Sequence, residues 1–228
     1  TLLYGTLLPG PDIGRRCLTL MRSVMEAGFE VGIHTCDHVK WQNNVAQADA
    51  EWTTREMREA FDRFSEIFGE NAHVHGAAGW QMNPHAFRLT QKLGFNYASD
   101  TRGHSPFIPV QNAEIVACPQ LPTTLPTLDE LLGIEEDAAT HLLKMSEDPK
   151  PTGHVYTLHA ELEGMKLIDT FEKLLLGWKA MGYELVSLKN YFDSLSVHDL
   201  PRHEVIYDEI PGRAGKLAMQ GGAFLAMD

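Results

Sequence analysis

The sequence is short of cysteine, of basic residues and of long apolar runs, and each shortage excludes a class of protein. Its three cysteines, Cys17, Cys36 and Cys118, stand far apart and form no CxxC pair, which argues against a disulfide framework or a cysteine-based zinc site. Lys and Arg number 19 against 31 Asp and Glu, so the net charge is −12 and the basic face of a nucleic-acid-binding protein is missing. No apolar run approaches the roughly 20 residues of a membrane-spanning helix. We therefore expect no nucleic-acid partner and no transmembrane segment.

What the sequence does contain is an alternation of helical and strand-like segments. Hydrophobic residues make up 43% of the 228 positions, which is enough for a packed core. Amphipathic periodicity, caps and glycine stops predict helices over 12–27, 53–68, 84–93, 128–145, 164–181 and 188–195. Short apolar runs predict strands over 30–35, 73–77, 95–99, 155–159 and 183–187. Repeated βα units of this length indicate a mostly parallel sheet covered by helices, arranged as an open sheet or a barrel.

Proline and glycine mark the irregular parts of the chain. Between Thr101 and Pro126 prolines recur too often for a long element, which predicts a loop region with short strands. The segment that starts at Pro211 is rich in glycine and predicts an irregular surface loop. The expected organisation is one domain over 1–210 followed by an irregular tail over 211–228.

Polar side chains follow three of the predicted strands at the point where each strand ends. These residues are His34 and His38 after the first strand, Asp100 and Arg102 after the second, and His159 at the end of the third. Reactive groups of α/β proteins gather at the carboxyl ends of parallel strands. We therefore expect the three groups to meet at one rim and to form an active site.

His34 and His38 form an H-x-x-x-H spacing directly after a strand. At such a turn both imidazoles can face one point and bind a divalent metal such as Zn²⁺. A catalytic zinc site also needs a third protein ligand and an open position for water. In a chain with 11 histidines this spacing also arises by chance, so the position after the strand is what favours a metal site.

The other polar residues at the strand ends each allow two interpretations. His159 is a general acid or base, because imidazole titrates near neutral pH, or a core histidine bonded to a backbone carbonyl. Asp100 either holds His159 in one tautomer or caps a turn, and Arg102 either binds a carboxylate or substrate phosphate or forms a surface salt bridge. Trp80 is either a core plug or a wall of the substrate groove. Glu163 is interpreted as part of the solvated start of the following helix.

The segments that carry these residues resemble the polysaccharide deacetylase (NodB-homology) family. His34–His38 (HTCDH) matches that family's H-[ST]-x-x-H metal motif, and Leu158-His159 within YTLH resembles its late catalytic motif. Six segments, in order HTCDHVKWQ, AAGWQ, SDTRG, LPTTLPTLDE, YTLHAELEG and PGRAG, are similar to the family's deformylase branch. The resemblance covers nearly the whole chain. It implies a deformed (β/α) barrel and an amide hydrolase that removes formate from a formamidoarabinose carried on undecaprenyl phosphate.

The resemblance also implies a role for individual residues. His34 and His38 would hold a divalent metal, with Zn²⁺ as the expected ion. His159, oriented by Asp100, would protonate the leaving amine.

The chain departs from the family pattern at two places. The family's first motif is an aspartate pair on the first barrel strand, which supplies the catalytic base and the third metal ligand, and nothing here matches it. We therefore expect a fragment without the family's N-terminal portion, an incomplete barrel and no activity from this chain alone. The arginine motif that orients the base in many deacetylases reads Ala78–Gln81 here. Arg102 is the candidate to replace it, and Trp80 and Arg102 are the expected substrate-binding residues.

The biological role that the resemblance implies is the attachment of aminoarabinose to lipid A, with resistance to polymyxin as its result. The enzyme would work on the cytoplasmic side of the bacterial inner membrane, in peripheral contact with the lipid surface. Two other functions stay open. One is a secreted chitin or peptidoglycan deacetylase, and the other is a catalytically inactive carbohydrate- or lipid-binding domain.

Overall fold

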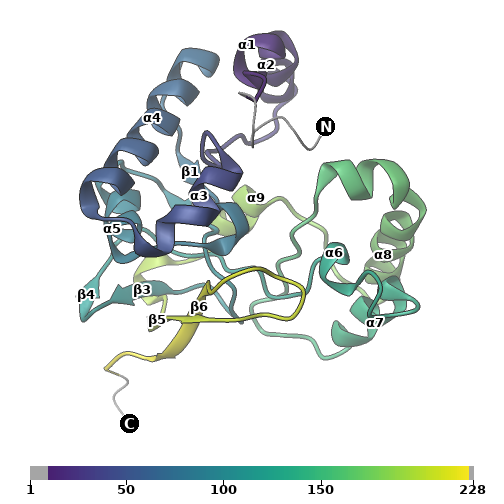
Figure 1. Ribbon diagram of the computed structural model, residues 1–228. Helices are drawn as coiled ribbons and strands as arrows, with labels where there is room; N and C mark the ends of the chain where they lie inside the picture. Colours follow the sequence, from purple (N-terminus) through teal and green to yellow (C-terminus); the bar gives the residue numbers. More distant parts are fainter. Residues whose placement is uncertain (1–9, 226–228) are drawn as a thin grey trace.

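A computed structural model describes residues 10–225 as an α/β fold built around a row of short parallel segments (Figure 1). Its α-helices are α1 (Ile13–Arg16), α2 (Leu18–Glu26), α3 (His38–Asn44), α4 (Ala50–Phe68), α5 (Pro84–Lys92), α6 (Leu128–Leu131), α7 (Ala138–Met145), α8 (Ile168–Ala180) and α9 (Leu188–Asp193). Its strands are β1 (Val74–His75), β2 (Tyr97–Ala98), β3 (Ile108–Gln111), β4 (Glu114–Ile115), β5 (Arg202–Asp208) and β6 (Leu217–Ala223). Short 3₁₀ turns cover Val45–Gln47, Ala78–Trp80 and Val197–Asp199, and a π-helical turn covers Leu162–Lys166.

The parallel row follows the order of the chain. β1 pairs in parallel with β2, with Val74 opposite Tyr97. Ile33 forms a parallel bridge to β1 on one side, and Gln120 forms one to β2 on the other. Neighbouring parallel segments in sequence order are what successive βα units produce. The row is therefore part of the deformed (β/α) barrel that the sequence predicts.

A second sheet with the strand order β4-β3-β5-β6 corrects the prediction for the tail. Residues 211–228 were expected to be irregular, but β6 lies within them and pairs antiparallel with β5. One of the glycines that suggested a loop, Gly221, serves close packing instead. A Cβ at Gly221 would lie 2.8 Å from the Ile206 side chain and 2.9 Å from a backbone oxygen of Glu204, so only glycine lets the two strands approach.

The predictions of strands over 30–35, 155–159 and 183–187 were wrong. The first contains only the bridge at Ile33, and the other two are extended chain outside any sheet ladder. The Val155 carbonyl accepts backbone N–H bonds from Thr124 at 3.0 Å and Leu125 at 3.4 Å. Apolar and β-branched residues favour an extended backbone, but a strand also requires a neighbour in register to pair with.

Local signals at the helix ends were read more accurately. α5 begins as predicted, because the Asn83 side chain accepts a hydrogen bond from the Ala86 N–H and Pro84 occupies the first helical position. α4 ends at Gly69 in the left-handed conformation, also as predicted. Its start differs, because Asp49 rather than Thr53 caps the helix and α4 begins at Ala50.

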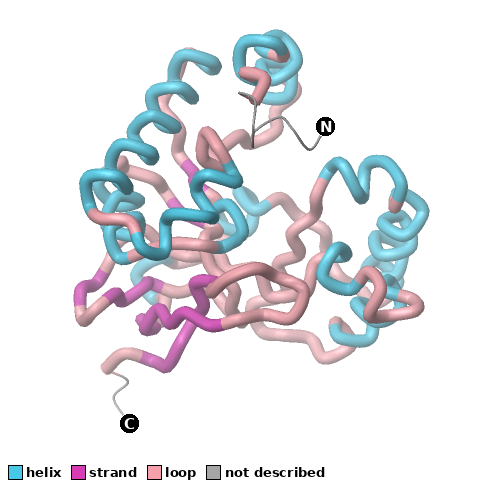
Figure 2. Tube along the Cα trace, in the orientation of Figure 1, coloured by secondary structure: helices cyan, strands magenta, loops and turns pink. Residues whose placement is uncertain are grey.

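Two groups of helices enclose the polar rim of the row. Figure 2 shows α3–α5 on one side and α6–α8 on the other, with loops between them. The first group packs on the largest hydrophobic cluster, and the second forms its own cluster around Leu142, Leu174 and Trp178. Within residues 10–225, no helix combines the length and the apolar character needed to cross a bilayer.

Candidate active site

A cavity of about 660 Å³ lies between the carboxyl ends of the parallel row and the helices α8 and α9. Four of the predicted site residues line it, namely His34, His38, Trp80 and His159. Residues that lie more than 120 positions apart thus share one cavity. Of the three groups expected to meet at one rim, the two histidine segments share the cavity, whereas Asp100 and Arg102 are not among its lining residues.

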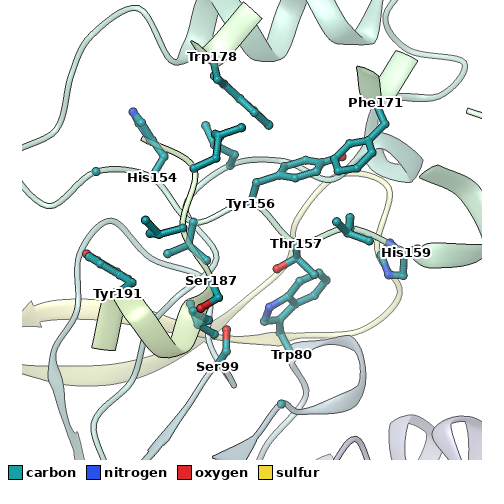
Figure 3. A pocket seen from close by; sticks show the side chains of 18 of the residues that line it. Trp80, Ser99, His154, Tyr156, Thr157, His159, Phe171, Trp178, Ser187 and Tyr191 are labelled. Carbon is teal, nitrogen blue, oxygen red and sulfur yellow. The ribbon is translucent and has the colours of Figure 1, made fainter. Parts of the chain in front are cut away.

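The remaining lining of the cavity is largely apolar and aromatic. Figure 3 shows Tyr156, Phe171 and Trp178 grouped together, and His159 on the same side of the cavity as Trp80. The rings of Tyr156 and Trp178 are 5.3 Å apart between centroids. The cavity therefore has a polar end with three histidines and an apolar wall beside it.

The geometry of the histidine pair suits a metal site. The ring centroids of His34 and His38 are 5.2 Å apart, so the two imidazoles can reach a common point. Nδ1 of His34 donates to the Gly76 carbonyl at 2.8 Å, which leaves Nε2 with its lone pair available. Metal-binding histidines typically donate their second nitrogen to a carbonyl or carboxylate in this way.

The loop between the two histidines is strained. Thr35 has a φ of +64°, and its hydroxyl is buried without a hydrogen-bond partner among the described residues. A β-branched residue in the left-handed region costs roughly 1–3 kcal/mol, and such strain concentrates at functional sites. The loop then turns directly into α3, which starts at His38 and is capped by the Asp37 side chain through the Lys40 N–H.

Two neutral imidazoles fit a divalent ion such as Zn²⁺ but do not complete its ligand set. Across residues 10–225, no third His, Cys, Asp or Glu joins them to form a metal-binding group. His34 is suited to metal binding because desolvation by the surrounding protein lowers its pKa. The hydrogen bond to the Gly76 carbonyl raises the pKa but does not outweigh the desolvation. The neighbouring His38, His75 and His159 lower the pKa of His34 further, and a neutral imidazole is the form that binds metals.

His159 is half-buried and faces a carboxylate that the sequence analysis did not assign. Its Nδ1 lies 3.5 Å from Oδ1 of Asp129, within ion-pair range but too long for a good hydrogen bond. The Thr127 hydroxyl donates to the same Asp129 oxygen at 2.5 Å, and Nη2 of Arg213 does so at 2.9 Å. Asp129 is therefore held in place beside His159 by the segment before α6 and by the C-terminal region.

The expectation that Asp100 orients His159 was wrong. Asp100 is completely buried, and its Oδ1 accepts a hydrogen bond from Nδ1 of the buried His75 at 2.6 Å. Its second oxygen accepts from the Gln120 amide at 3.2 Å. Asp100 thus connects the end of β2 to β1 through His75. Both of its carboxylate oxygens are bound by residues that do not line the cavity.

Arg102 binds a carboxylate, which was one of its expected roles, but it does so in the interior and not in the cavity. It is only 7% exposed, and its guanidinium donates to Glu130 at 2.6 Å and to the Leu125 carbonyl at 3.0 Å. Both Arg102 and Arg213 lie over the Trp80 indole, with distances of 4.8 and 4.9 Å to its centroid. The guanidinium of Arg102 is therefore occupied in supporting Trp80 and is not free to bind a substrate phosphate.

Trp80 is both a core residue and a wall of the cavity. It is 5% exposed, and its indole N–H donates to the Thr123 hydroxyl at 3.1 Å. Gly79 before it has a φ of +62°, and a Cβ there would lie 2.0 Å from the Gln42 amide. The glycine thus allows the turn that presents Trp80 to the cavity.

Sequence reasoning missed Asp129, Arg213 and Glu163. Asp129 lies within the segment TLDE, which contains the capping box of Thr127 and Glu130 and could have been recognised as a helix start. Arg213 was assigned to an irregular tail, and Glu163 was expected to be solvated but is 0% exposed. No local pattern distinguishes these residues, because their partners come from distant segments.

Comparisons with known proteins show which family the chain belongs to. No family model matches the chain. It is 34% identical over 96% of its length to a protein of Shewanella sediminis (strain HAW-EB3) named "Probable 4-deoxy-4-formamido-L-arabinose-phosphoundecaprenol deformylase ArnD", of which it covers 71%. It is 28% identical over 95% of its length to a protein of the same name from Wigglesworthia glossinidia brevipalpis, of which it covers 76%.

A crystal structure assigned as a polysaccharide deacetylase from Mycobacterium smegmatis has the same fold. The TM-score is 0.63 at 15% identity, over 89% of this chain and 77% of that one. Together with the sequence relatives, this shows the family. The chain belongs to the ArnD deformylases, amide hydrolases that share the polysaccharide deacetylase fold.

Proposed function

We propose that the protein removes formate from 4-deoxy-4-formamido-L-arabinose carried on undecaprenyl phosphate, once its metal site is completed by a third ligand that residues 10–225 do not provide. The observation that carries the proposal is the cavity in which His34, His38 and His159 meet beside an aromatic wall. The names of the two sequence relatives supply the substrate. Hydrolysis breaks the C–N bond of the formamide, adds hydroxide from water to the formyl carbon and leaves a free amine on the sugar.

His34 and His38 would hold a divalent metal, with Zn²⁺ the best match to two imidazole ligands. When bound, such an ion supplies a Lewis acid for the formyl carbonyl oxygen. The Gly76 carbonyl fixes the ring and tautomer of His34, so that Nε2 faces the ion.

His159 would act as the general acid that protonates the departing amine nitrogen. It lines the same cavity as the histidine pair, and the carboxylate of Asp129 lies 3.5 Å from its Nδ1, where it can help to orient the ring. Trp80 would form part of the cavity wall beside the sugar ring, near His159. Arg102 and Arg213 keep its indole in position.

The proposed substrate also sets the partner and the place of action. A sugar on undecaprenyl phosphate is anchored in a lipid bilayer, so the chain would contact the cytoplasmic surface of the inner membrane as a peripheral protein. The free amine would then reduce the negative charge of lipid A after transfer of aminoarabinose. Resistance to polymyxin is the expected cellular result.

The test measures formate release from the undecaprenyl-phosphate-linked formamido sugar together with metal content. His159→Ala should retain metal and lose roughly 100- to 10,000-fold in turnover, the usual contribution of one positioned acid. His34→Ala should lose the metal, and the exposed His73→Ala serves as the matched control that changes neither.

The alternatives give different results in the same assay. Faster release of acetate from an N-acetylated polysaccharide would indicate a polysaccharide deacetylase. Binding of the lipid-linked sugar with no release of formate, in protein that contains stoichiometric metal, would indicate a binding domain. Full activity of His159→Ala would refute the proposed mechanism.

A further inference from the structure

Glu163 is a buried carboxylate next to two residues of the cavity, and the proposed reaction assigns it no role. It is 0% exposed, yet both of its oxygens accept hydrogen bonds from uncharged donors. Burying a carboxylate without a cation is unfavourable. The two hydrogen bonds that Glu163 accepts are therefore the place to look for its role.

Both donors belong to the segment that ends in His159. The Tyr156 hydroxyl donates to Oε1 at 2.8 Å, and the backbone N–H of His159 donates to Oε2 at 3.0 Å. The Tyr156 ring is part of the aromatic wall and packs against Trp178. One carboxylate thus connects the wall of the cavity to the backbone of the proposed acid.

The backbone of the following turn holds His159 from its other side. The His159 carbonyl accepts hydrogen bonds from the N–H groups of Leu162 at 2.8 Å and Glu163 at 3.0 Å. The turn continues as the π-helical segment Leu162–Lys166, a rare conformation that occurs often at functional sites. With both its N–H and its carbonyl bound, His159 has a fixed backbone, and only its side-chain torsions remain free.

The placement of this backbone decides what the His159 ring can reach. Nδ1 is 3.5 Å from Asp129, so a small displacement in the wrong direction would separate the two groups. A misplacement of about 1 Å can cost roughly 100-fold in rate when a reacting group must be aligned.

We propose that Glu163 is a positioning residue, whose buried carboxylate ties Tyr156 to the backbone of His159 and so sets the position of the His159 imidazole. The inference rests on the proposed function, in which His159 is the general acid. In this role Glu163 acts through His159 and does not contact the substrate.

The test compares Glu163→Ala and Glu163→Gln with Glu161→Ala, an exposed glutamate just before the same turn. Two quantities are measured, the hydrogen exchange of the His159 amide by NMR and the steady-state release of formate from the lipid-linked formamido sugar. Glu163→Ala should speed exchange at His159 about tenfold, since a hydrogen bond to a buried charged group is lost. It should lower kcat about 10- to 100-fold while KM changes less than about threefold, because a positioning residue acts on the reacting group rather than on binding.

Glu163→Gln is the conservative rescue. Its carbonyl oxygen can accept the His159 N–H and its amide can meet the Tyr156 oxygen, so exchange and kcat should stay within about threefold of the unmodified chain. Glu161→Ala should change neither quantity. Should Glu163→Ala not fold, Tyr156→Phe takes its place, with an expected increase in His159 exchange of about threefold from the loss of one of the two bonds.

Unchanged exchange at His159, or unchanged kcat in a folded Glu163→Ala whose exchange has risen, would overturn the inference. An equal loss of kcat in the Gln and Ala variants would also overturn it. If the full-length, metal-loaded protein releases no formate, the proposed function fails, and the exchange rates alone then decide whether Glu163 holds His159.

Discussion

Replacing Glu130 with alanine should destabilise the protein strongly, because Glu130 is the shared partner of two arginines around Trp80. It is 4% exposed, and its Oε1 accepts hydrogen bonds from Arg102 at 2.6 Å and from Arg213 at 2.7 Å. Its Oε2 accepts from the Thr127 N–H at 3.1 Å and completes the capping box of α6. The substitution leaves the guanidinium of Arg102 buried with one backbone carbonyl as its remaining partner.

The magnitude follows from the burial of the pair. Removing one partner of a buried ion pair costs roughly 3–5 kcal/mol, since the other charge stays in the interior uncompensated. For a domain of about 150–250 residues each kcal/mol corresponds to about 2–4 °C, so the melting temperature should fall by roughly 6–20 °C. The exposed pair Arg88–Glu114 provides the control, and Glu114→Ala should cost less than about 1 kcal/mol.

The same carboxylate makes the effect depend on pH. Burial tends to raise the pKa of Glu130, but the hydrogen bonds from Arg102 and Arg213 outweigh it and hold the pKa below its usual value. A carboxyl group whose pKa is lower in the folded state stabilises the fold above its unfolded pKa, near 4.3, and loses that contribution as the pH falls through the folded value. The difference in the free energy of unfolding between the unmodified protein and Glu130→Ala should therefore be constant near neutral pH and become smaller below about pH 4.

Urea denaturation at pH 7 and at a series of acidic values measures this gap. A loss below about 1 kcal/mol at neutral pH would show that Glu130 and Arg102 do not form a compensated buried pair. A gap that widens on acidification would refute the sign of the pKa shift. In either case Arg102 would again become a candidate for substrate binding.

Three further predictions concern the cavity and its support. Asp129→Asn should leave metal content unchanged and lower kcat about 10- to 100-fold, because His159 loses the carboxylate that lies 3.5 Å from its Nδ1; unchanged kcat in the folded variant would contradict this. Gly79→Ala should cost about 1–3 kcal/mol in a thermal melt, since its φ is positive and the new Cβ would clash with Gln42, and a neutral result would mean that this turn relaxes freely. Thr35→Gly should raise the free energy of unfolding by about 0.5–2 kcal/mol, because it relieves the left-handed strain and removes a buried hydroxyl that has no partner among the described residues. Its metal affinity should fall, because the loop between His34 and His38 becomes more flexible. A lower free energy of unfolding would show that the backbone at Thr35 is not strained.

The parts of the fold that depend on neighbouring residues could be predicted from the sequence. The start of α5 at Pro84, the end of α4 at Gly69 and the strands β1 and β2 follow from caps, stops and short apolar runs. The second sheet could not be predicted this way. Gly221 of β6 is a glycine because its backbone lies against β5, and a single sequence shows the glycine without showing that neighbour.

By itself the sequence predicted that His34, His38 and His159 would meet at one rim, and all three line the cavity although the strands predicted over 30–35 and 155–159 do not form. Only the tertiary structure decided how each polar side chain there is bound. Asp100 pairs with His75, Asp129 stands beside His159, Arg102 lies buried over Trp80, and Glu163 holds the backbone of the acid. The physical reason is the range of the interactions. Caps and periodicity act within a few residues, whereas a buried charge takes whatever partner the packing of distant segments brings within hydrogen-bond distance.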